Sequence, residues 1–196
     1  MVVQTFSHVY YLPHDWKLGD LRTAAAKSSA SSSMFAMTSG LPIREFLCPP
    51  VVGPIKKGLS WAARRELLDQ HGFYDARIIG GGDTLMACAF FGYFEAVFRR
   101  KHMNDRQQEH FLAWAEPVAK VVRGAAGVME GNIFHLWHGD LNARQLRTRD
   151  QDLSGFDFDP FEDIAVNASG CWRWNTNKPA MHDFMRKYFV SRREDG

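Results

Sequence analysis

The stretch GFYDARIIGGGDTLMACAFFG, residues 72–92, places three glycines and an aspartate directly before an apolar run. A glycine in regular structure costs about 0.5–1 kcal/mol relative to alanine, because it loses more backbone freedom on folding. The sequence keeps Gly80, Gly81 and Gly82 together. This indicates either a turn that needs their freedom or a ligand that approaches bare backbone. Asp83 is a preferred N-cap residue, so it predicts a helix over residues 84–91 that ends at glycine 92.

The carboxylate of Asp83 has two compatible interpretations. As a helix cap it accepts hydrogen bonds from backbone N–H groups at the helix start. As a general base it removes a proton from a hydroxyl, while the glycines leave room for a sugar ring. The motif is not GxGxxG, and no Lys-Ser or Lys-Thr pair follows it, so it supports neither a dinucleotide fingerprint nor a P-loop.

The surrounding segments predict an α/β protein. A strand is predicted over residues 2–12, and a strand that leads into a loop over 127–140. Helices are predicted over 60–72, 104–124 and 179–195, and a loop-rich segment over 27–58. The helix over 60–72 is expected to be capped by Ser60, the helix over 104–124 by Asn104, and the last helix starts on a proline. Helices that alternate with strands are typical of the α/β class. The 196 residues are enough for one domain over 1–196 with its own core.

Composition excludes two classes of partner and favours one compartment. The net charge of +2, with 23% charged residues, is too balanced for a dedicated nucleic-acid binder. No run approaches 18 apolar residues, so no membrane span is predicted. The three cysteines form no CxxC pair and no signal-like segment opens the sequence, which indicates free thiols in the cytoplasm.

His135 and His138, in FHLWHGD, are candidate metal ligands. Zinc-binding helices place histidines at i and i+4, so this spacing is no zincin motif. In a strand the two side chains point to opposite faces, and they meet one ion only if the strand breaks near Trp137. A metal-dependent hydrolase that adds Asp140 as a third ligand is the alternative function from this motif.

Two further motifs allow a binding role. The acidic run FDFDPFED, residues 156–163, lacks the EF-hand pattern and is more typical of a turn at Asp159. In CWRWN, Trp172 and Trp174 can share one face of a strand, where they either pack in a core or form the surface of a non-catalytic carbohydrate-binding module.

Taken in order, GLSWAARRELLDQHGFYDARIIGGGD and FHLWHG resemble the second half of GT-A glycosyltransferases of the family 2 type. These enzymes carry a Gly-rich stretch, a helix, a GF or GGF pair, an acidic GGED-type motif and then a histidine near a strand end. The related galactosyltransferases show WGGEDDD at the acidic motif. The resemblance spans residues 58–139. It implies a partial GT-A-like, Rossmann-like fold: a C-terminal portion with a mixed sheet and flanking helices.

The resemblance also implies a reaction and a site. An acceptor hydroxyl would attack the anomeric carbon of a nucleotide sugar, with Asp83 as the base. Trp61 and the glycines 80–82 would contact substrate. His135 or His138 would complete a Mn²⁺ (or Mg²⁺) site, and the metal would neutralise the departing diphosphate.

The chain departs from the family pattern in two places. Gly82-Asp83-Thr84 stands where the family often has two acidic residues, so one contact to the acceptor is absent. The family's Asp-x-Asp motif precedes these segments, whereas the nearest such pattern here, Asp157–Asp159, follows the histidines. The resemblance therefore implies a C-terminal, acceptor-side half, whose expected partners are a nucleotide-sugar donor, a carbohydrate acceptor and a missing N-terminal half.

Overall fold

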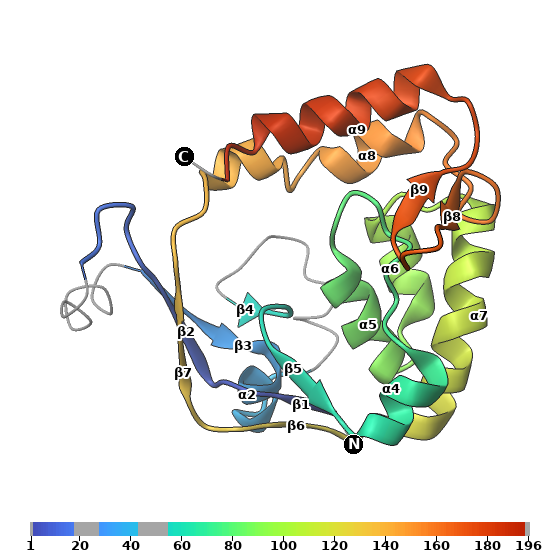
Figure 1. Ribbon diagram of the computed structural model, residues 1–196. Helices are drawn as coiled ribbons and strands as arrows, with labels where there is room; N and C mark the ends of the chain where they lie inside the picture. Colours follow the sequence, from blue (N-terminus) through green and yellow to red (C-terminus); the bar gives the residue numbers. More distant parts are fainter. Residues whose placement is uncertain (1, 18–27, 43–54, 195–196) are drawn as a thin grey trace. The chain divides into compact units, whose positions relative to one another are not determined.

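A computed structural model describes residues 2–17, 28–42 and 55–194. It is a mixed α/β structure, which confirms the predicted class. Its helices and strands are labelled in Figure 1, and its contacts separate into two compact units. The first comprises Met1–Phe73, Asp83–Tyr93 and Ala115–Trp137, and the second comprises Tyr74–Gly82, Phe94–Trp114 and His138–Gly196. No helix in the described ranges has both the length and the apolar character that a membrane crossing requires.

The first unit contains two sheets of mixed direction. Their strands are β1 (Val2–Gln4), β2 (His8–Tyr11), β3 (Ser29–Ser32), β4 (Ile55–Lys56), β5 (Trp61–Ala63), β6 (Ala126–Val128) and β7 (Asn132–His135). The strand orders are β5-β1-β6 and β4-β3-β2-β7. β1 pairs antiparallel with β5 and parallel with β6, while β2 pairs antiparallel with β3 and parallel with β7.

The strand predicted over residues 2–12 is divided into β1 and β2. Between them, Thr5 donates from its backbone N–H to the Ser60 carbonyl at 3.2 Å, and Ser7 donates to the Gly131 carbonyl at 2.9 Å. Phe6 lies between these two residues and is fully buried in a cluster with Val9 and Ala30. The three linking residues are therefore fixed by tertiary contacts that the local sequence does not reveal.

The helix predicted from Ser60 starts later than expected. Residues 61–63 form β5, because they pair with β1 in the register Gln4↔Trp61. The helix α4 (Arg65–His71) follows, and Gly72 ends it as predicted. The prediction of Ser60 as the N-cap is wrong, since the cap position is Arg64.

The segment predicted to be loop-rich, residues 27–58, contains regular structure where it is described. β3 leads into the helix α2 (Ser33–Thr38), which contacts β3, β4 and β6. Ser32 caps this helix, because its hydroxyl accepts a hydrogen bond from the Phe35 N–H at 3.1 Å. Residue 27 and residues 43–54 of the segment lie outside the described residues.

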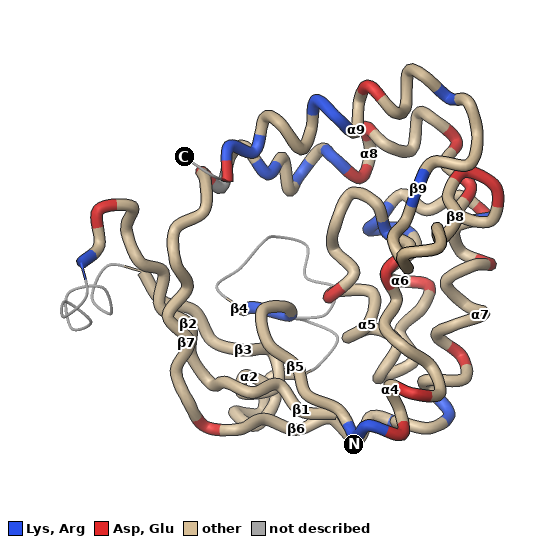
Figure 2. Tube along the Cα trace, in the orientation of Figure 1, with Lys and Arg blue, Asp and Glu red and all other residues tan. Residues whose placement is uncertain are grey.

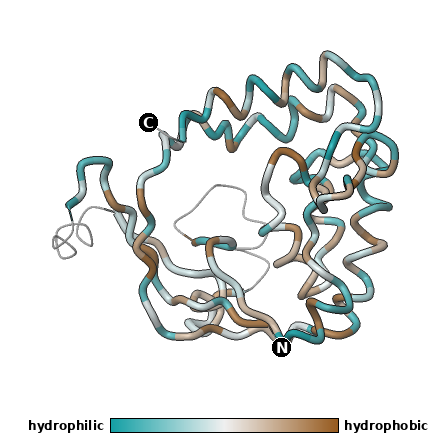
Figure 3. Tube along the Cα trace, in the orientation of Figure 1, coloured by the Kyte–Doolittle hydropathy of each residue, from teal (hydrophilic) through white to brown (hydrophobic). Residues whose placement is uncertain are grey.

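The glycine stretch leads into the helix α5 (Gly82–Phe90), which starts two residues before the predicted helix and ends one residue before it. Asp83 lies inside the first turn rather than at the cap, and its Oδ1 accepts a hydrogen bond from the Thr84 N–H at 2.8 Å. Most of the remaining helix is apolar and buried (Figure 3). Gly92 follows with a φ of 71°, as expected for a glycine just after a helix.

The second unit is mainly helical. Its elements are α6 (Phe94–Arg100), the first ten residues of α7 (Asp105–Val122), the short helix η1 (Leu141–Arg144), α8 (Arg149–Ser154), the strand pair β8 (Ile164–Val166) and β9 (Trp172–Trp174), and α9 (Pro179–Ser191). Two predictions are confirmed here: Asn104 Oδ1 caps α7 by accepting from the Gln107 N–H at 2.9 Å, and α9 starts on Pro179. Pro117 lies inside α7.

Charged residues are interspersed rather than gathered by sign. Basic and acidic positions occur together on α8 and on α9 (Figure 2). On α9, Asp183 pairs with Arg186 at 2.5 Å and with Lys187 at 2.7 Å. Exposed ion pairs of this kind contribute little to stability, so the second unit is stabilised mainly by its apolar core. Phe111, Phe158 and Met181 are among its buried side chains.

Candidate functional site

Asp83 is held against bare backbone. A Cβ added at Gly58 would clash with the Asp83 carboxylate, mainly with Oδ2, so a larger residue at position 58 would require the Asp83 side chain to move. The other carboxylate oxygen accepts the Thr84 N–H at 2.8 Å. Within the described part of the chain Asp83 forms no ion pair. An ordered, partly buried carboxylate without a counter-charge is a suitable proton acceptor.

A buried glutamine fixes the loop that carries Gly58. Gln4 is fully buried, and its amide nitrogen donates to the carbonyls of Lys56 at 3.0 Å and Gly58 at 3.2 Å. Its amide oxygen accepts from the Ser33 hydroxyl at 3.0 Å and the Met34 N–H at 3.1 Å. Because both ends of the amide are satisfied, the loop against Asp83 is rigidly positioned.

Trp61 follows this loop as the first residue of β5. Its indole N–H donates to the Lys57 carbonyl at 2.7 Å, and its ring packs edge-on against Phe90 with centroids 5.5 Å apart. The indole N–H is thus used within the protein. Only the exposed part of its ring is left for the substrate contact that the resemblance assigns to Trp61.

The glycine turn before α5 requires its glycines. Gly80 and Gly81 have φ values of 87° and 85°, a region that side-chain-bearing residues rarely adopt. A Cβ at Gly81 would lie 2.5 Å from Lys101 Nζ, and one at Gly80 would lie 3.4 Å from Nη1 and Nη2 of Arg149. A Cβ at Gly82 would lie 3.2 Å from the Tyr74 carbonyl. Both conformation and close packing therefore explain the glycines.

A buried group of charges lies beside this turn. We call Arg77, Lys101, Arg149 and Asp150 the buried charge cluster, and each is no more than 8% exposed. Asp150 contacts Arg77 Nη2 at 2.5 Å through Oδ1 and Lys101 Nζ at 3.0 Å through Oδ2. Arg77 also donates to Gln107 Oε1 and to the Lys101 carbonyl, each at 2.9 Å. The cluster joins the glycine turn to α6, α7 and α8 of the second unit.

The protonation equilibria of the cluster follow from burial and charge. Burial lowers the pKa of Lys101, and the attraction of Asp150 only partly offsets this effect. Burial raises the pKa of Asp150, but the charges of Lys101 and Arg77 outweigh it and hold that pKa below the ordinary aspartate value. Asp150 is therefore the ionised centre of the cluster.

The two histidines belong to different units. His135 is in the first unit, on β7, where its ring packs against Tyr11 with centroids 5.0 Å apart. His138 is in the second unit, where Nδ1 lies 3.1 Å from Glu194 Oε1 and both ring nitrogens contact the Arg144 guanidinium. A cationic guanidinium at both nitrogens opposes cation binding by His138 as it is placed. No group of three or more His, Cys, Asp or Glu side chains suited to a metal occurs among the described residues.

The acidic run FDFDPFED forms an internally bonded loop. Asp163 is fully buried and accepts from Thr176 Oγ1 at 2.5 Å and Lys178 Nζ at 2.8 Å. Asp159 pairs with Arg106 at 2.9 Å. These carboxylates are engaged by cations and hydroxyls of the protein, so the run acts as a structural turn.

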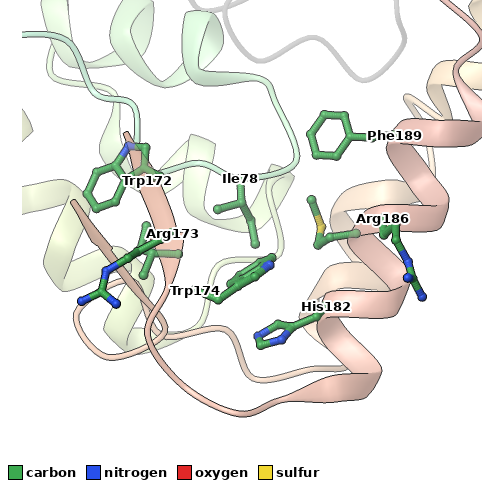
Figure 4. Close-up of a pocket in the computed structure, with 9 residues that line it drawn as sticks. Ile78, Trp172, Arg173, Trp174, His182, Arg186 and Phe189 are labelled. Carbon is green, nitrogen blue, oxygen red and sulfur yellow. The ribbon is translucent and has the colours of Figure 1, made fainter. Parts of the chain in front are cut away.

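An aromatic cleft lies within the second unit. Its volume is about 350 Å³, and its lining residues are Ile78, Ile164, Trp172, Arg173, Trp174, His182, Met185, Arg186 and Phe189. Trp174 lies between Ile78 and His182 (Figure 4), and its ring stacks on His182 with centroids 4.3 Å apart. Trp172 and Trp174 are 39% and 36% exposed. Arg173 and Arg186 point away from the enclosed space (Figure 4), so the cleft is mainly apolar.

Sequence reasoning missed the buried charge cluster. Its members come from three separate places in the sequence, and Arg149 and Asp150 look locally like part of an exposed run, RTRD. The one signal in the sequence was the pair Gly80 and Gly81, because a glycine is often required where a bulky side chain packs directly against the backbone. Compared with known proteins, the chain matches no protein-family model, no curated protein and no solved structure.

Proposed function

We propose that the chain is the acceptor-side part of a glycosyltransferase that uses a nucleotide-sugar donor. The observation that carries the proposal is the environment of Asp83: a carboxylate at the start of α5, packed on the bare backbone of Gly58 and without an ion-pair partner among the described residues. The order of the motifs around it, and their resemblance to GT-A enzymes of the family 2 type, supply the reaction class.

In the proposed step, Asp83 accepts the proton of an acceptor hydroxyl. The hydroxyl oxygen forms a bond to the anomeric carbon of the donor sugar. The bond from that carbon to the diphosphate oxygen breaks, and the nucleoside diphosphate leaves with the electron pair. A positioned base of this kind contributes about 10²–10⁴-fold to a rate.

The mixed sheets and flanking helices are compatible with the C-terminal portion of a GT-A fold. The requirement for Mn²⁺ stays a prediction, with His135 as its candidate ligand. The Arg144 guanidinium beside the His138 ring makes His138 unsuited to bind a metal, and the proposed step uses Asp83 without one.

The first test replaces the proposed base. We expect Asp83→Asn to lower turnover about 10²-fold or more, because an amide cannot accept the proton, while the fold is retained. The measurement is nucleoside diphosphate release from a panel of nucleotide sugars, with mixed saccharide acceptors and with Mn²⁺ present.

Asp105→Asn is the matched control. Asp105 is also an acidic residue in the first turn of a helix, and its variant should retain full turnover. The proposal is rejected if no donor is consumed even when a nucleotide-binding half is supplied as a separate chain, or if Asp83→Asn and Asp105→Asn release nucleoside diphosphate at the same rate.

The aromatic cleft favours a second candidate function, a non-catalytic carbohydrate-binding module. Two half-exposed tryptophans are unusual for a core, and flat indole faces suit the apolar faces of sugar rings. The cleft volume falls at the lower end of the range of about 300–1,000 Å³ that is common for small-molecule sites.

Glycan-array binding separates the two candidates. For a binding module, Trp174→Ala should abolish glycan binding whereas Asp83→Asn leaves it intact. Phe73→Ala removes an exposed aromatic ring outside the cleft and serves as the control. If Trp174→Ala binds glycans as well as the unmodified chain does, the cleft is not the glycan-binding site.

A further inference from the structure

The buried charge cluster holds more positive than negative charge. Arg77, Lys101 and Arg149 supply three cationic groups, and Asp150 is the one carboxylate that the structure pairs with them in the described residues. The penalty for burying a charged group amounts to several kcal/mol unless a counter-charge accompanies it. A bound anion would therefore balance the excess positive charge of the cluster.

Arg149 is the cation that lacks a counter-charge. Its Nη1 donates to the neutral Tyr188 hydroxyl at 2.7 Å, and its Nε is buried without a hydrogen-bond partner. It forms no ion pair within residues 2–17, 28–42 and 55–194. Tyr188 cannot neutralise the guanidinium, so part of the donor capacity of Arg149 is unused.

Nη2 of Arg149, which donates no hydrogen bond to the described residues, lies beside the glycine turn. The positions that a Cβ would take on Gly80 and Gly81 lie 3.4 Å and 3.8 Å from Arg149 Nη2. In the described residues, the backbone N–H groups of Gly81 and Gly82 donate no hydrogen bond, whereas the Gly80 N–H is bonded to the Arg77 carbonyl at 3.2 Å. Successive N–H groups in a turn can form a concavity that binds anions.

We propose that the guanidinium of Arg149 and the backbone N–H groups of Gly81 and Gly82 form a site for a phosphate or diphosphate group. A planar guanidinium can bind two oxygens of one phosphoryl group, and charge-assisted hydrogen bonds of this kind are about twice as strong as neutral ones. Lys101, fixed by Asp150 beside Gly81, adds positive potential without having to contact the ligand. The site is independent of the proposed role of Asp83.

The probes are inorganic phosphate, pyrophosphate and UDP, titrated into the full chain at constant ionic strength with chloride as the balancing anion. Calorimetry gives the affinity, and amide NMR locates the site. We expect binding of pyrophosphate in the millimolar range or tighter, with the largest amide shifts at Gly81 and Gly82. Arg149→Met should weaken this binding about tenfold or more, because the paired charge-assisted bonds are lost.

Arg106→Met is the control, because Arg106 is exposed and already paired with Asp159 and Glu109. It should bind pyrophosphate as the unmodified chain does. If UDP binds more tightly than pyrophosphate, the site takes a nucleoside diphosphate. If UDP binds equally or less tightly, it takes a free phosphoryl anion.

The proposal is overturned if none of the three probes binds, or if the amide shifts fall away from the glycine turn. Undiminished binding by Arg149→Met overturns it as well. Should that variant fail to fold, the amide shifts of the unmodified chain decide the question alone.

Discussion

A single carboxylate organises the buried charge cluster. Asp150 uses one oxygen for Arg77 and the other for Lys101, and all three side chains are almost fully buried. When one partner of such a group is removed, the remaining charges stay in a medium that solvates them poorly. The stability of the second unit should therefore depend strongly on this one residue.

We expect Asp150→Asn to lower the free energy of unfolding by about 3–5 kcal/mol at neutral pH. The pKa of Asp150 lies below the ordinary aspartate value in the folded protein, so its ion pairs stabilise fully above the unfolded pKa of about 3.9. This stabilisation is lost as the pH falls through the folded pKa. The difference between the variant and the unmodified chain should thus narrow below about pH 4 in urea unfolding experiments.

Asp152→Asn is the comparison, because Asp152 is an exposed aspartate on the same helix, α8. Its effect should stay within about 0.5 kcal/mol, as for most surface substitutions. Equal effects of the two variants at neutral pH would show that the ion pairs of Asp150 do not stabilise the fold.

At the scale of elements, the glycine turn and α5 depend on two separate constraints. One is the backbone, since Gly80 and Gly81 both have positive φ values. The other is packing, since Lys101 occupies the space beside Gly81 and is itself held by Asp150. Gly92, at the other end of α5, has a φ of 71° but no atom within 4 Å of its Cβ position.

Alanine substitutions at Gly92 and Gly81 can therefore separate the backbone constraint from the packing constraint. Gly92→Ala should cost about 1–2 kcal/mol, from backbone strain alone. Gly81→Ala carries the same strain and also displaces the Lys101 ammonium group, so it should cost at least about 1 kcal/mol more. The measurement is the free energy of unfolding of both variants. A Gly81→Ala variant as stable as Gly92→Ala would contradict the packing constraint.

At the scale of the whole molecule, the sequence predicted the features that depend on interactions between neighbouring residues. The α/β class, the Asn104 cap, the Pro179 start of α9 and the stop at Gly72 each follow from a few neighbouring residues. The predicted helix start at Ser60 is wrong, because residues 61–63 pair with β1 and form a strand instead.

The candidate site was predictable only in part. Asp83 and its glycines stand out in the sequence, and the structure gives each of them a distinct environment. The buried charge cluster did not stand out, because charged residues are common and their burial depends on contacts between distant segments. The same holds for Gln4, a polar residue near one end of the sequence that is fully buried.

The strand β1 has a consequence for the order in which the chain folds during synthesis. Its partners are β5, about sixty residues later, and β6, more than a hundred residues later. The Gln4 amide likewise finds its carbonyl partners only when Lys56 and Gly58 have been made. The ribosome therefore releases β1 long before either edge of it can pair, and the loop that supports Asp83 is completed late. Until then both edges of β1 lack their native partners.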